Sequence, residues 1–275
     1  MYTNPMKALI IFFLLITGLF ADSIINLPPG LTIIEEPMFI EQDNVTIIGN
    51  ESSVLKLGKH KNCPIIVVGE RSEKPTKQIN NIKLINVVLD GNKDFQDSEY
   101  MTSMPYLRNN CLTVRGATNV YIENIVVCNA RSGGVVFELG TNNSIINGIN
   151  AHSNYWDGFA ACASTKNMIR NGLFHSNQAA GISLDWRTDN NIFSDLIIEN
   201  NGDQGIFLRD CRNNYFKNIA LKYTGIFLGS RDINYPDTAC FENIFLLLNQ
   251  PYIEIDSNSA KNKNLFLLNK VQDKR

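Results

Sequence analysis

Four side chains that carry a charge or a thiol recur at nearly constant spacing in the middle of the chain. Glu138, Cys162, Asp185 and Arg209 follow one another at an interval of roughly 24 residues. If each interval is one turn of a repeating structure, Asp185 and Arg209 lie about 4.8 Å apart, close enough for an ion pair. Glu138 and Asp185 would then be about 10 Å apart between backbones, so their carboxyl groups approach the ~6.5 to 9.5 Å separation of inverting glycosidases.

The same four side chains suit two other interpretations. An arginine that neutralises a uronate carboxylate, with a base nearby to take the α proton, is what a lyase or an epimerase requires. A solvated polar column with one surface ion pair requires no site at all.

Aromatic side chains stand beside charged ones at two turns of this region. Tyr155 and Trp156 precede Asp157, and Trp186 precedes Arg187 in the next repeat. Exposed rings next to carboxylates commonly bind the apolar face and the hydroxyls of a sugar. A turn tryptophan can equally cover one end of a hydrophobic core, so both interpretations stay open.

Two of the three histidines lie in the same tripeptide, which begins at His152 and again at His175. Stacked imidazoles about 5 Å apart could transfer protons or bind a metal. The neighbouring asparagines indicate a period one residue longer than the histidine spacing, which leaves the stacking open, and a polar ladder is the favoured interpretation. Because no third ligand converges on the pair, we predict no metal site and no cofactor.

These side chains need a repeating scaffold, and the sequence contains one. Strand-like segments begin after an asparagine at the same period of roughly 24 residues, at Asn119, Asn143, Asn167, Asn191 and Asn214. Each leads through a polar turn to a second short strand that follows a glycine, at Gly134, Gly158, Gly181, Gly205 and Gly225. One parity of the second strands is apolar and predicts the core, beginning with Val135, Phe159, Ile182, Ile206 and Ile226. The other parity is mixed and is expected to face outward, with Val136, Ala160, Ser183, Phe207 and Phe227 before the column that contains Glu138.

Short strands and turns of this period cannot bury an apolar side alone, so successive coils must stack in parallel around a closed core. Asparagine suits the turn positions 129, 154, 177 and 200, because it tolerates a left-handed backbone and its amide can bond along a ladder. The repeat therefore predicts an all-β fold, a single-stranded parallel β-helix with coils of about 24 residues.

The repeat also predicts how the chain is organised. Residues 22–275 are expected to form a single domain, with a loop insertion at about 93–109 and a C-terminal cap at about 250–275 over the open sheet edge. A solenoid needs no partner to complete its core, so a monomer is expected.

The N-terminus has the order of an export signal. Lys7 precedes an apolar run over residues 8–20, and Ala21 precedes a polar residue. The run is shorter than the ~20 residues that span a bilayer, so residues 1–21 are expected to be a cleaved signal peptide, with an uncleaved anchor as the alternative. The mature chain is then secreted or periplasmic, with no stable membrane insertion.

Composition narrows the class of partner. The 25 basic and 27 acidic residues leave no positive surplus, so nucleic acid is not an expected partner. The six cysteines all lie in the mature part and are compatible either with disulfides or with buried free thiols.

Several strings resemble the repeats of right-handed β-helix proteins in the pectin lyase-like superfamily: NNIFSDLIIENNGDQGIFLRDCRNN, HSNYWDGFAA, HSNQAAGISL and VVLDGN. The resemblance implies a right-handed coil and a polysaccharide as partner. The superfamily includes polysaccharide lyases, hydrolases, uronate epimerases, binding modules and assembly factors, so it does not select an activity. The motifs typical of polygalacturonases, pectate lyases and alginate epimerases are missing, and no catalytic residue transfers by motif.

The leading hypothesis is a secreted lyase- or epimerase-like enzyme that acts on an acidic glycan. Arg209 or Arg187 would neutralise the substrate carboxylate, His175 or Asp157 would accept the proton, and Asp185 would orient the arginine. The candidate substrate-binding residues are Glu138, Tyr155, Trp156, Trp186 and Arg187.

Two rival hypotheses come from other classes. The missing catalytic signatures favour a non-catalytic carbohydrate-binding or surface-assembly protein. A glycoside hydrolase that uses Glu138 and Asp185 is least favoured, because the pairing with Arg209 should keep Asp185 ionised and unsuited to act as an acid.

Overall fold

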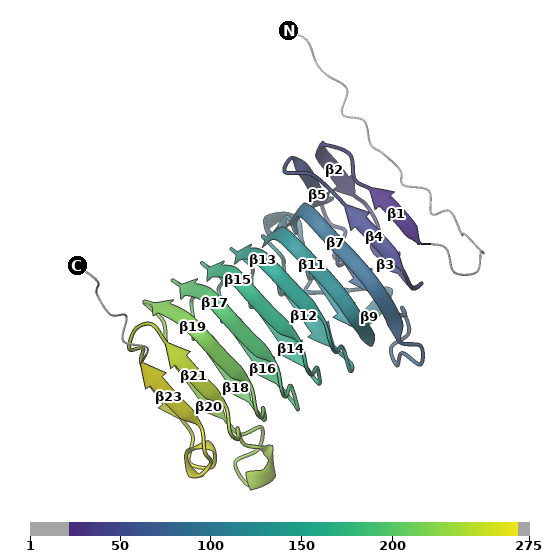
Figure 1. The fold of residues 1–275 in the computed structure, drawn as a ribbon. Coiled ribbons are helices and arrows are strands. Elements are labelled where there is room, and N and C mark those ends of the chain that lie inside the picture. Colours follow the sequence, from purple (N-terminus) through teal and green to yellow (C-terminus); the bar gives the residue numbers. More distant parts are fainter. Residues whose placement is uncertain (1–21, 269–275) are drawn as a thin grey trace.

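The computed structural model describes residues 22–268, and the predicted signal peptide lies outside the described residues. The chain winds into a parallel β-solenoid whose coils stack in one row from the N-terminal to the C-terminal end (Figure 1). This confirms the predicted fold class. None of the helices within the described part is long and apolar enough to cross a membrane.

Two parallel sheets form the walls of the solenoid, and each coil contributes a strand to both. Sheet A contains β1 (Ser23–Asn26), β4 (Val45–Ile48), β7 (Ile79–Asp90), β11 (Ala117–Cys128), β13 (Ile145–His152), β15 (Met168–His175), β17 (Ile192–Glu199), β19 (Tyr215–Lys222), β21 (Ile244–Leu247) and β23 (Leu265–Leu268), with β2 (Gly30–Ile34) and β5 (Ser53–Leu57) beside them. Sheet B contains β3 (Met38–Ile40), β6 (Ile66–Val68), β10 (Leu112–Arg115), β12 (Val135–Glu138), β14 (Phe159–Cys162), β16 (Ile182–Asp185), β18 (Ile206–Arg209), β20 (Ile226–Gly229) and β22 (Ile253–Ile255).

Three short 3-10 helices and one hairpin complete the described chain. The helices are η1 (Lys93–Phe95), η2 (Pro236–Thr238) and η3 (Ser259–Lys261). The antiparallel strands β8 (Tyr100–Met101) and β9 (Met104–Arg108) lie within the segment expected to be a loop insertion. Within the segment expected to be a cap, β22 and β23 each add a further strand to a sheet.

The core follows the predicted parity in sheet B. Val135, Phe159, Ile182, Ile206 and Ile226 pair in register and are buried. In sheet A, the buried Phe193, Phe216 and Phe245 and the partly buried Phe266 continue the packing from coil to coil, with ring centroids 4.6 to 4.7 Å apart. Side chains of one type therefore stack on their equivalents in the next coil.

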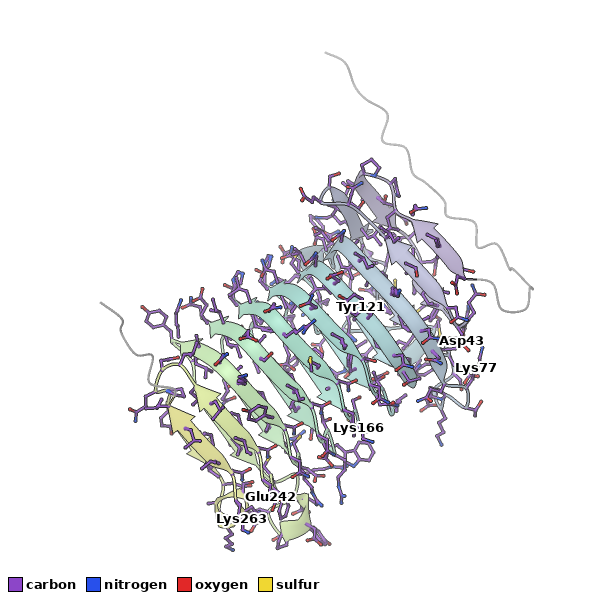
Figure 2. The ribbon with its side chains drawn as sticks, viewed as in Figure 1. Asp43, Lys77, Tyr121, Lys166, Glu242 and Lys263 are labelled. Atoms are coloured by element: carbon purple, nitrogen blue, oxygen red, sulfur yellow. The ribbon has the colours of Figure 1, made fainter. Side chains whose placement is uncertain are left out.

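The register of sheet A differs by one residue from the predicted alignment. Ile145 pairs with Met168, so this coil is one residue shorter than the asparagine spacing predicts, and Asn143 lies in line with Lys166 rather than with Asn167. The column that contains Asn119 and Asn143 is left-handed, with φ near +50°, and continues through Lys166, Asn190, Asn213 and Glu242. Lys166 and Glu242 both lie at turns along one edge of the solenoid (Figure 2). The predicted alignment therefore treated two adjacent positions as one: the left-handed position of Asn143 and the next position, which Asn167 occupies.

The second asparagine position forms a buried ladder. The side-chain oxygen of Asn214 accepts the backbone N–H of Asn191 at 3.0 Å, and its amide donates to the Thr188 carbonyl at 2.9 Å. The amide also donates to the side-chain oxygen of Asn243 at 3.0 Å. Asn191 repeats all three bonds, and Asn167 repeats the two to the preceding coil. Each asparagine thus satisfies polar groups in the turn of the preceding coil and joins its own coil to the next.

A second asparagine ladder runs along the turn that precedes the sheet B strands. The residues predicted for this turn were partly wrong. Asn154 and Asn177 are members, and the third is Asn201 rather than Asn200. Asn129 and Asn200 instead occupy left-handed positions, with φ of 54° and 52°. Asparagine favours both environments, so residue type alone does not separate them.

All six cysteines are unpaired, and five of them are buried. Of the two possibilities left open by the sequence, free thiols are confirmed. Burial raises the pKa of Cys63 to about 12 and that of Cys128 to about 11, so these thiols stay protonated at neutral pH.

The ladder yields a stability prediction. Asn214→Ala leaves the N–H of Asn191 and the carbonyl of Thr188 buried without partners, and each such group costs about 1 to 3 kcal/mol. We expect the free energy of unfolding to fall by about 3 kcal/mol, measured as a lower urea midpoint. Asn213→Gly is the matched control, because glycine adopts the left-handed backbone of that exposed position without strain. Equal midpoints for the two variants would contradict the role of the ladder.

Candidate functional site

The outward side of sheet B carries a continuous polar column. Cys162 pairs with Asp185 and Asp185 with Arg209, as expected, and Arg115 extends the column by pairing with Glu138. We call the outward side of β12, β14, β16, β18 and β20 the open face.

Asp185 and Arg209 form a two-point ion pair across neighbouring coils. Arg209 Nε donates to Asp185 Oδ1 at 3.1 Å, and Nη2 donates to Oδ2. The backbone N–H of Trp186 donates to the same Oδ1 at 2.8 Å. Hydrogen bonding to Asp185 raises the pKa of Arg209, and both side chains remain partly exposed on the open face.

Glu138 and Arg115 form a second ion pair at the N-terminal end of the column, with 3.2 Å between Arg115 Nε and Glu138 Oε1. Arg115 is only 1% exposed, and its Nη2 donates to the Glu73 carbonyl at 3.2 Å. Burial raises the pKa of Glu138, and the positive charge of Arg115 opposes that shift. Our sequence reasoning missed Arg115, although one further step of the same interval back from Glu138 would have reached it.

Cys162 separates the two ion pairs. Burial is the main cause that raises its pKa to about 11, and the charges of Asp185 and Glu138 add to the shift. A thiol with this pKa is protonated at neutral pH and is a poor nucleophile.

The hairpin β8–β9 covers the sheet where the open face ends. Tyr106 donates its hydroxyl hydrogen to the Arg71 carbonyl, and the Arg115 guanidinium lies 5.1 Å from the Tyr106 ring. The outward residues of β10 are buried as a result. Trp156, from a later coil, holds the residue that precedes the hairpin, because its Nε1 donates to Glu99 Oε2 at 2.7 Å. We call this hairpin the strap.

An apolar strip runs beside the polar column on the open face. It consists of the apolar Val136, Ala160, Phe207 and Phe227 and one small polar residue, Ser183, all partly exposed. The Phe207 and Phe227 rings stack with centroids 5.0 Å apart and planes 13° apart. The sequence placed these rings outward without assigning them a role, because alternation reports a side chain's direction and not its neighbours.

The aromatic candidates flank the open face on its two sides. Trp186, 48% exposed, lies beside the ion pair and carries the Arg231 guanidinium 4.5 Å from its ring centroid. Arg187 approaches Asp210 at 3.6 Å. On the other side, Tyr155 packs edge-on against Trp156 and stacks with Arg131 at 4.1 Å.

The two candidate proton acceptors are not brought to the ion pair. His175 lies in sheet A, where its ring stacks on that of His152 with centroids 4.9 Å apart, so the open question of their register is settled in favour of stacking. Asp157 lies in the turn before β14, at the opposite end of the strand from Cys162 and therefore about 16 Å along it. Neither can take a proton from a substrate carbon held against Arg209 in this geometry.

Asp157 has a structural partner of its own. Its Oδ1 accepts the backbone N–H of Ala180 at 2.9 Å. Burial raises its pKa to about 6, against the partial compensation of that hydrogen bond. Among residues 22–268, no group of three or more histidine, cysteine, aspartate and glutamate side chains is arranged to hold a metal ion.

Comparison with known proteins identifies the fold. A family model described as a right handed beta helix region matches residues 76–241. No curated protein sequence matches the chain significantly.

Three solved structures illustrate the likeness. PfbA, a surface adhesin of Streptococcus pneumoniae, is 11% identical with a TM-score of 0.67, over 88% of this chain and 69% of that one. The family 28 exopolygalacturonase of Yersinia enterocolitica is 16% identical with a TM-score of 0.57, over 90% of this chain and 64% of that one. The A-module of the mannuronan C-5 epimerase AlgE4 of Azotobacter vinelandii is 14% identical with a TM-score of 0.52, over 90% and 88%. At these identities the likeness establishes the fold alone.

The raised pKa of Asp157 predicts how stability changes with pH. Because the folded-state pKa of about 6 exceeds the ordinary value of 3.8, burying Asp157 costs little below pH 4 and costs more as the pH rises through 6. Asp157→Asn keeps an acceptor for Ala180 and removes the charge, so we expect it to be about 3 kcal/mol more stable than wild type at pH 7 and nearly equal at pH 3. Urea unfolding of both proteins across this range is the measurement. Asp94→Asn, at an exposed carboxyl, serves as the control, and the same pH profile for all three proteins would refute the prediction.

Proposed function

This chain belongs to the right-handed β-helix family, and on that premise we propose that it is a polysaccharide-acting protein that binds an acidic glycan along the open face. It works as a monomer after export, in the medium or the periplasm. The observation that carries the proposal is the apolar strip with stacked Phe207 and Phe227 lying directly beside the Asp185–Arg209 pair.

The polar column and the apolar strip offer complementary contacts to a sugar. Aromatic rings receive the apolar face of a pyranose, while carboxylate and guanidinium groups exchange hydrogen bonds with hydroxyls. Trp186 adds a further exposed ring at the side of the face. The known structures of similar fold include an exopolygalacturonase and a mannuronan epimerase, which supports a glycan as the ligand.

A preference for acidic glycans follows from the cations around Trp186. Arg187, Arg209 and Arg231 gather there with exposed or partly exposed side chains. Arginine binds carboxylates in a two-point geometry, which Arg209 already uses toward Asp185. A uronate carboxylate can therefore replace Asp185 on Arg209.

This replacement suggests how lyase or epimerase chemistry would proceed. Once the substrate carboxylate occupies Arg209, Asp185 loses its partner and becomes a base next to the neutralised uronate. Asp185 would then take the α proton, the role that the sequence had led us to assign to His175 or Asp157. Arg209 would stabilise the charge that develops on the substrate carboxylate.

A non-catalytic glycan-binding protein is the second candidate, and a specific observation favours it. Both carboxylates of the polar column already have arginine partners, and the thiol between them is protonated at neutral pH. The similarity to PfbA, an adhesin, agrees with this candidate. A hydrolase would instead need Glu138 as the acid and Asp185 as the base.

The test is to incubate purified protein with alginate, polygalacturonate and neutral polysaccharides, and to measure binding, ultraviolet absorbance of unsaturated sugars, new reducing ends and uronate composition. Absorbance establishes a lyase, altered composition an epimerase, new ends without absorbance a hydrolase, and binding alone the second candidate. No binding to any glycan would refute the proposal.

Variants locate the site. We expect Arg209→Ala to weaken binding of the acidic glycan about tenfold, the loss of one charge-assisted contact of roughly 1.4 kcal/mol. Lys56→Ala is the matched control, because Lys56 forms a comparable cross-coil ion pair with Asp90 at 2.8 Å in sheet A. Equal binding by the Arg209 and Lys56 variants would refute a binding site on the open face.

A further inference from the structure

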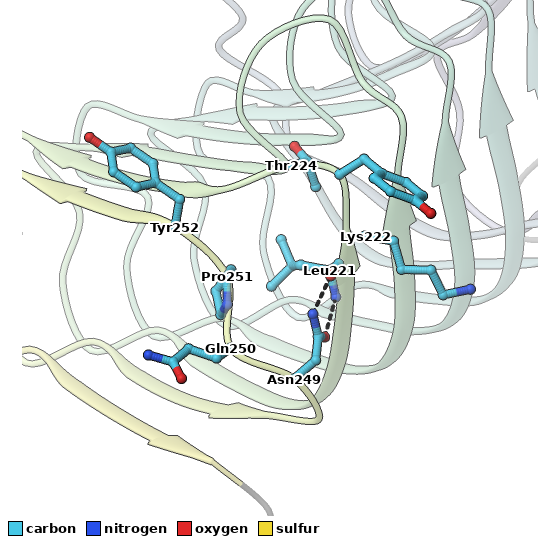
Figure 3. Close-up of a pocket in the computed structure, with 8 residues that line it drawn as sticks. Leu221, Lys222, Thr224, Asn249, Gln250, Pro251 and Tyr252 are labelled. Atoms are coloured by element: carbon cyan, nitrogen blue, oxygen red, sulfur yellow. Dashed lines mark hydrogen bonds between the residues drawn. The ribbon is translucent and has the colours of Figure 1, made fainter.

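A hollow lies at the turns that lead from sheet A into the last two strands of sheet B, β20 and β22. Its volume is about 370 Å³, and it is bounded by the two segments that lead into β20 and β22. Its lining is Leu221, Lys222, Tyr223, Thr224, Asn249, Gln250, Pro251 and Tyr252. Tyr252 and Lys222 stand on opposite sides of it, with Leu221 and Asn249 between them (Figure 3).

Tyr223 departs from the pattern of its own column. The residue after each sheet A strand is left-handed in successive coils, and it is Asn129, Ser153, Ser176 and Asn200 before it is Tyr223, whose φ is 54°. Asparagine and serine are small polar residues, whereas a bulky side chain in this conformation is strained. Tyr223 is also 88% exposed, so packing does not repay the strain. A strained, exposed aromatic residue is a reason to look for a ligand.

The opposite side and the floor of the hollow are well defined. Tyr252 is 72% exposed, and its carbonyl accepts the backbone N–H of Ile226 at 2.9 Å. The side-chain oxygen of Asn249 accepts the N–H of Leu221 at 2.8 Å, and its amide donates to the Leu221 carbonyl (Figure 3). The floor is therefore fixed before any ligand arrives, which reduces the entropic cost of binding.

The charges of the hollow favour an uncharged ligand. Of the described residues that line it, Lys222 is the one that carries a charge, and Lys222 Nζ lies 3.2 Å from Glu199 Oε2. The remaining polar side chains, those of Thr224, Asn249 and Gln250, offer hydroxyl and amide groups. Such groups suit the hydroxyls of a neutral sugar better than a carboxylate.

From this geometry we infer that the hollow is a binding subsite for a neutral pyranose unit, with a tyrosine ring against the apolar face of the sugar. The inference rests on the proposed function and deepens it, because the subsite lies at the turns leading into β20, the last strand of the open face. A glycan bound on that face would then carry neutral units at one end of the bound stretch.

The experiment compares wild type with Tyr223→Asn, Tyr252→Ala and Tyr235→Ala in affinity electrophoresis and calorimetry, with cellohexaose as the neutral probe and polygalacturonate as the acidic one. Tyr223→Asn restores the residue type of the earlier coils, so we expect it to raise Tm by about 2 to 4 °C while weakening cellohexaose binding about tenfold. Tyr252→Ala should weaken the same binding to a similar extent. Tyr235 is 65% exposed outside the hollow, so its variant should bind like wild type.

The outcomes separate this inference from the proposed function. If wild type and all three tyrosine variants bind cellohexaose equally, or if wild type binds only the acidic probe, the subsite is refuted while the open face stands. If no glycan of any kind binds to wild type, both are refuted. A Tyr223 variant that loses stability together with binding would assign a structural role to that ring and overturn the subsite.

Discussion

Every part of this molecule depends on the hydrogen bonds that join the turns of successive coils. A solenoid buries its turns against one another, so the polar groups of each turn must find partners in the neighbouring coils. Asn214 and its equivalents do this with one amide group each, which accepts from one coil and donates toward the next. Because these bonds tolerate no slip, they fix the register, and the register places Asp185 against Arg209.

Because the register is fixed, each outward side chain has a permanent neighbour in the next coil, and the charges of the two must be compatible. Neighbours about 4.8 Å apart interact strongly, so charges of opposite sign adjoin in both sheets, as in Lys56–Asp90 and Glu199–Lys222 of sheet A. Where like groups adjoin, the pKa responds: burial and the neighbouring His175 lower the pKa of His152. Ion pairs alone therefore do not identify a site in this fold. The open face differs from sheet A because its Asp185–Arg209 pair lies beside stacked, partly exposed phenylalanine rings and between flanking tryptophans.

The period of the sequence was sufficient to predict the solenoid, the core parity of sheet B and the Asp185–Arg209 pairing. The alignment of sheet B could be predicted because a glycine precedes each strand from β12 to β20 and leaves one alignment. The alignment of sheet A could not, because asparagine occupies both a left-handed position and the adjacent ladder position, and spacing cannot separate Asn143 from Asn167. The candidate site was predicted in part: the residues of one column lie together, whereas His175 lies in sheet A and Asp157 lies at the far end of its strand, both away from Arg209. Which sheet a residue joins, and at which end of its strand, decides whether two candidates meet.

The strap makes the two ends of the open face different, because it covers one of them. Without β8–β9, the outward side of β10 would continue the face, and Arg115 would be an exposed end of the polar column. The strap instead buries Arg115, so its charge must be balanced within the protein, and Glu138 is the carboxylate in reach. The pair nearest the strap is therefore committed to structure, while the Asp185–Arg209 pair, two coils further on, remains partly exposed. A ligand that competes for a charged partner on this face meets lower resistance at Arg209 than at Arg115, because displacing a buried ion pair costs more than displacing a solvated one.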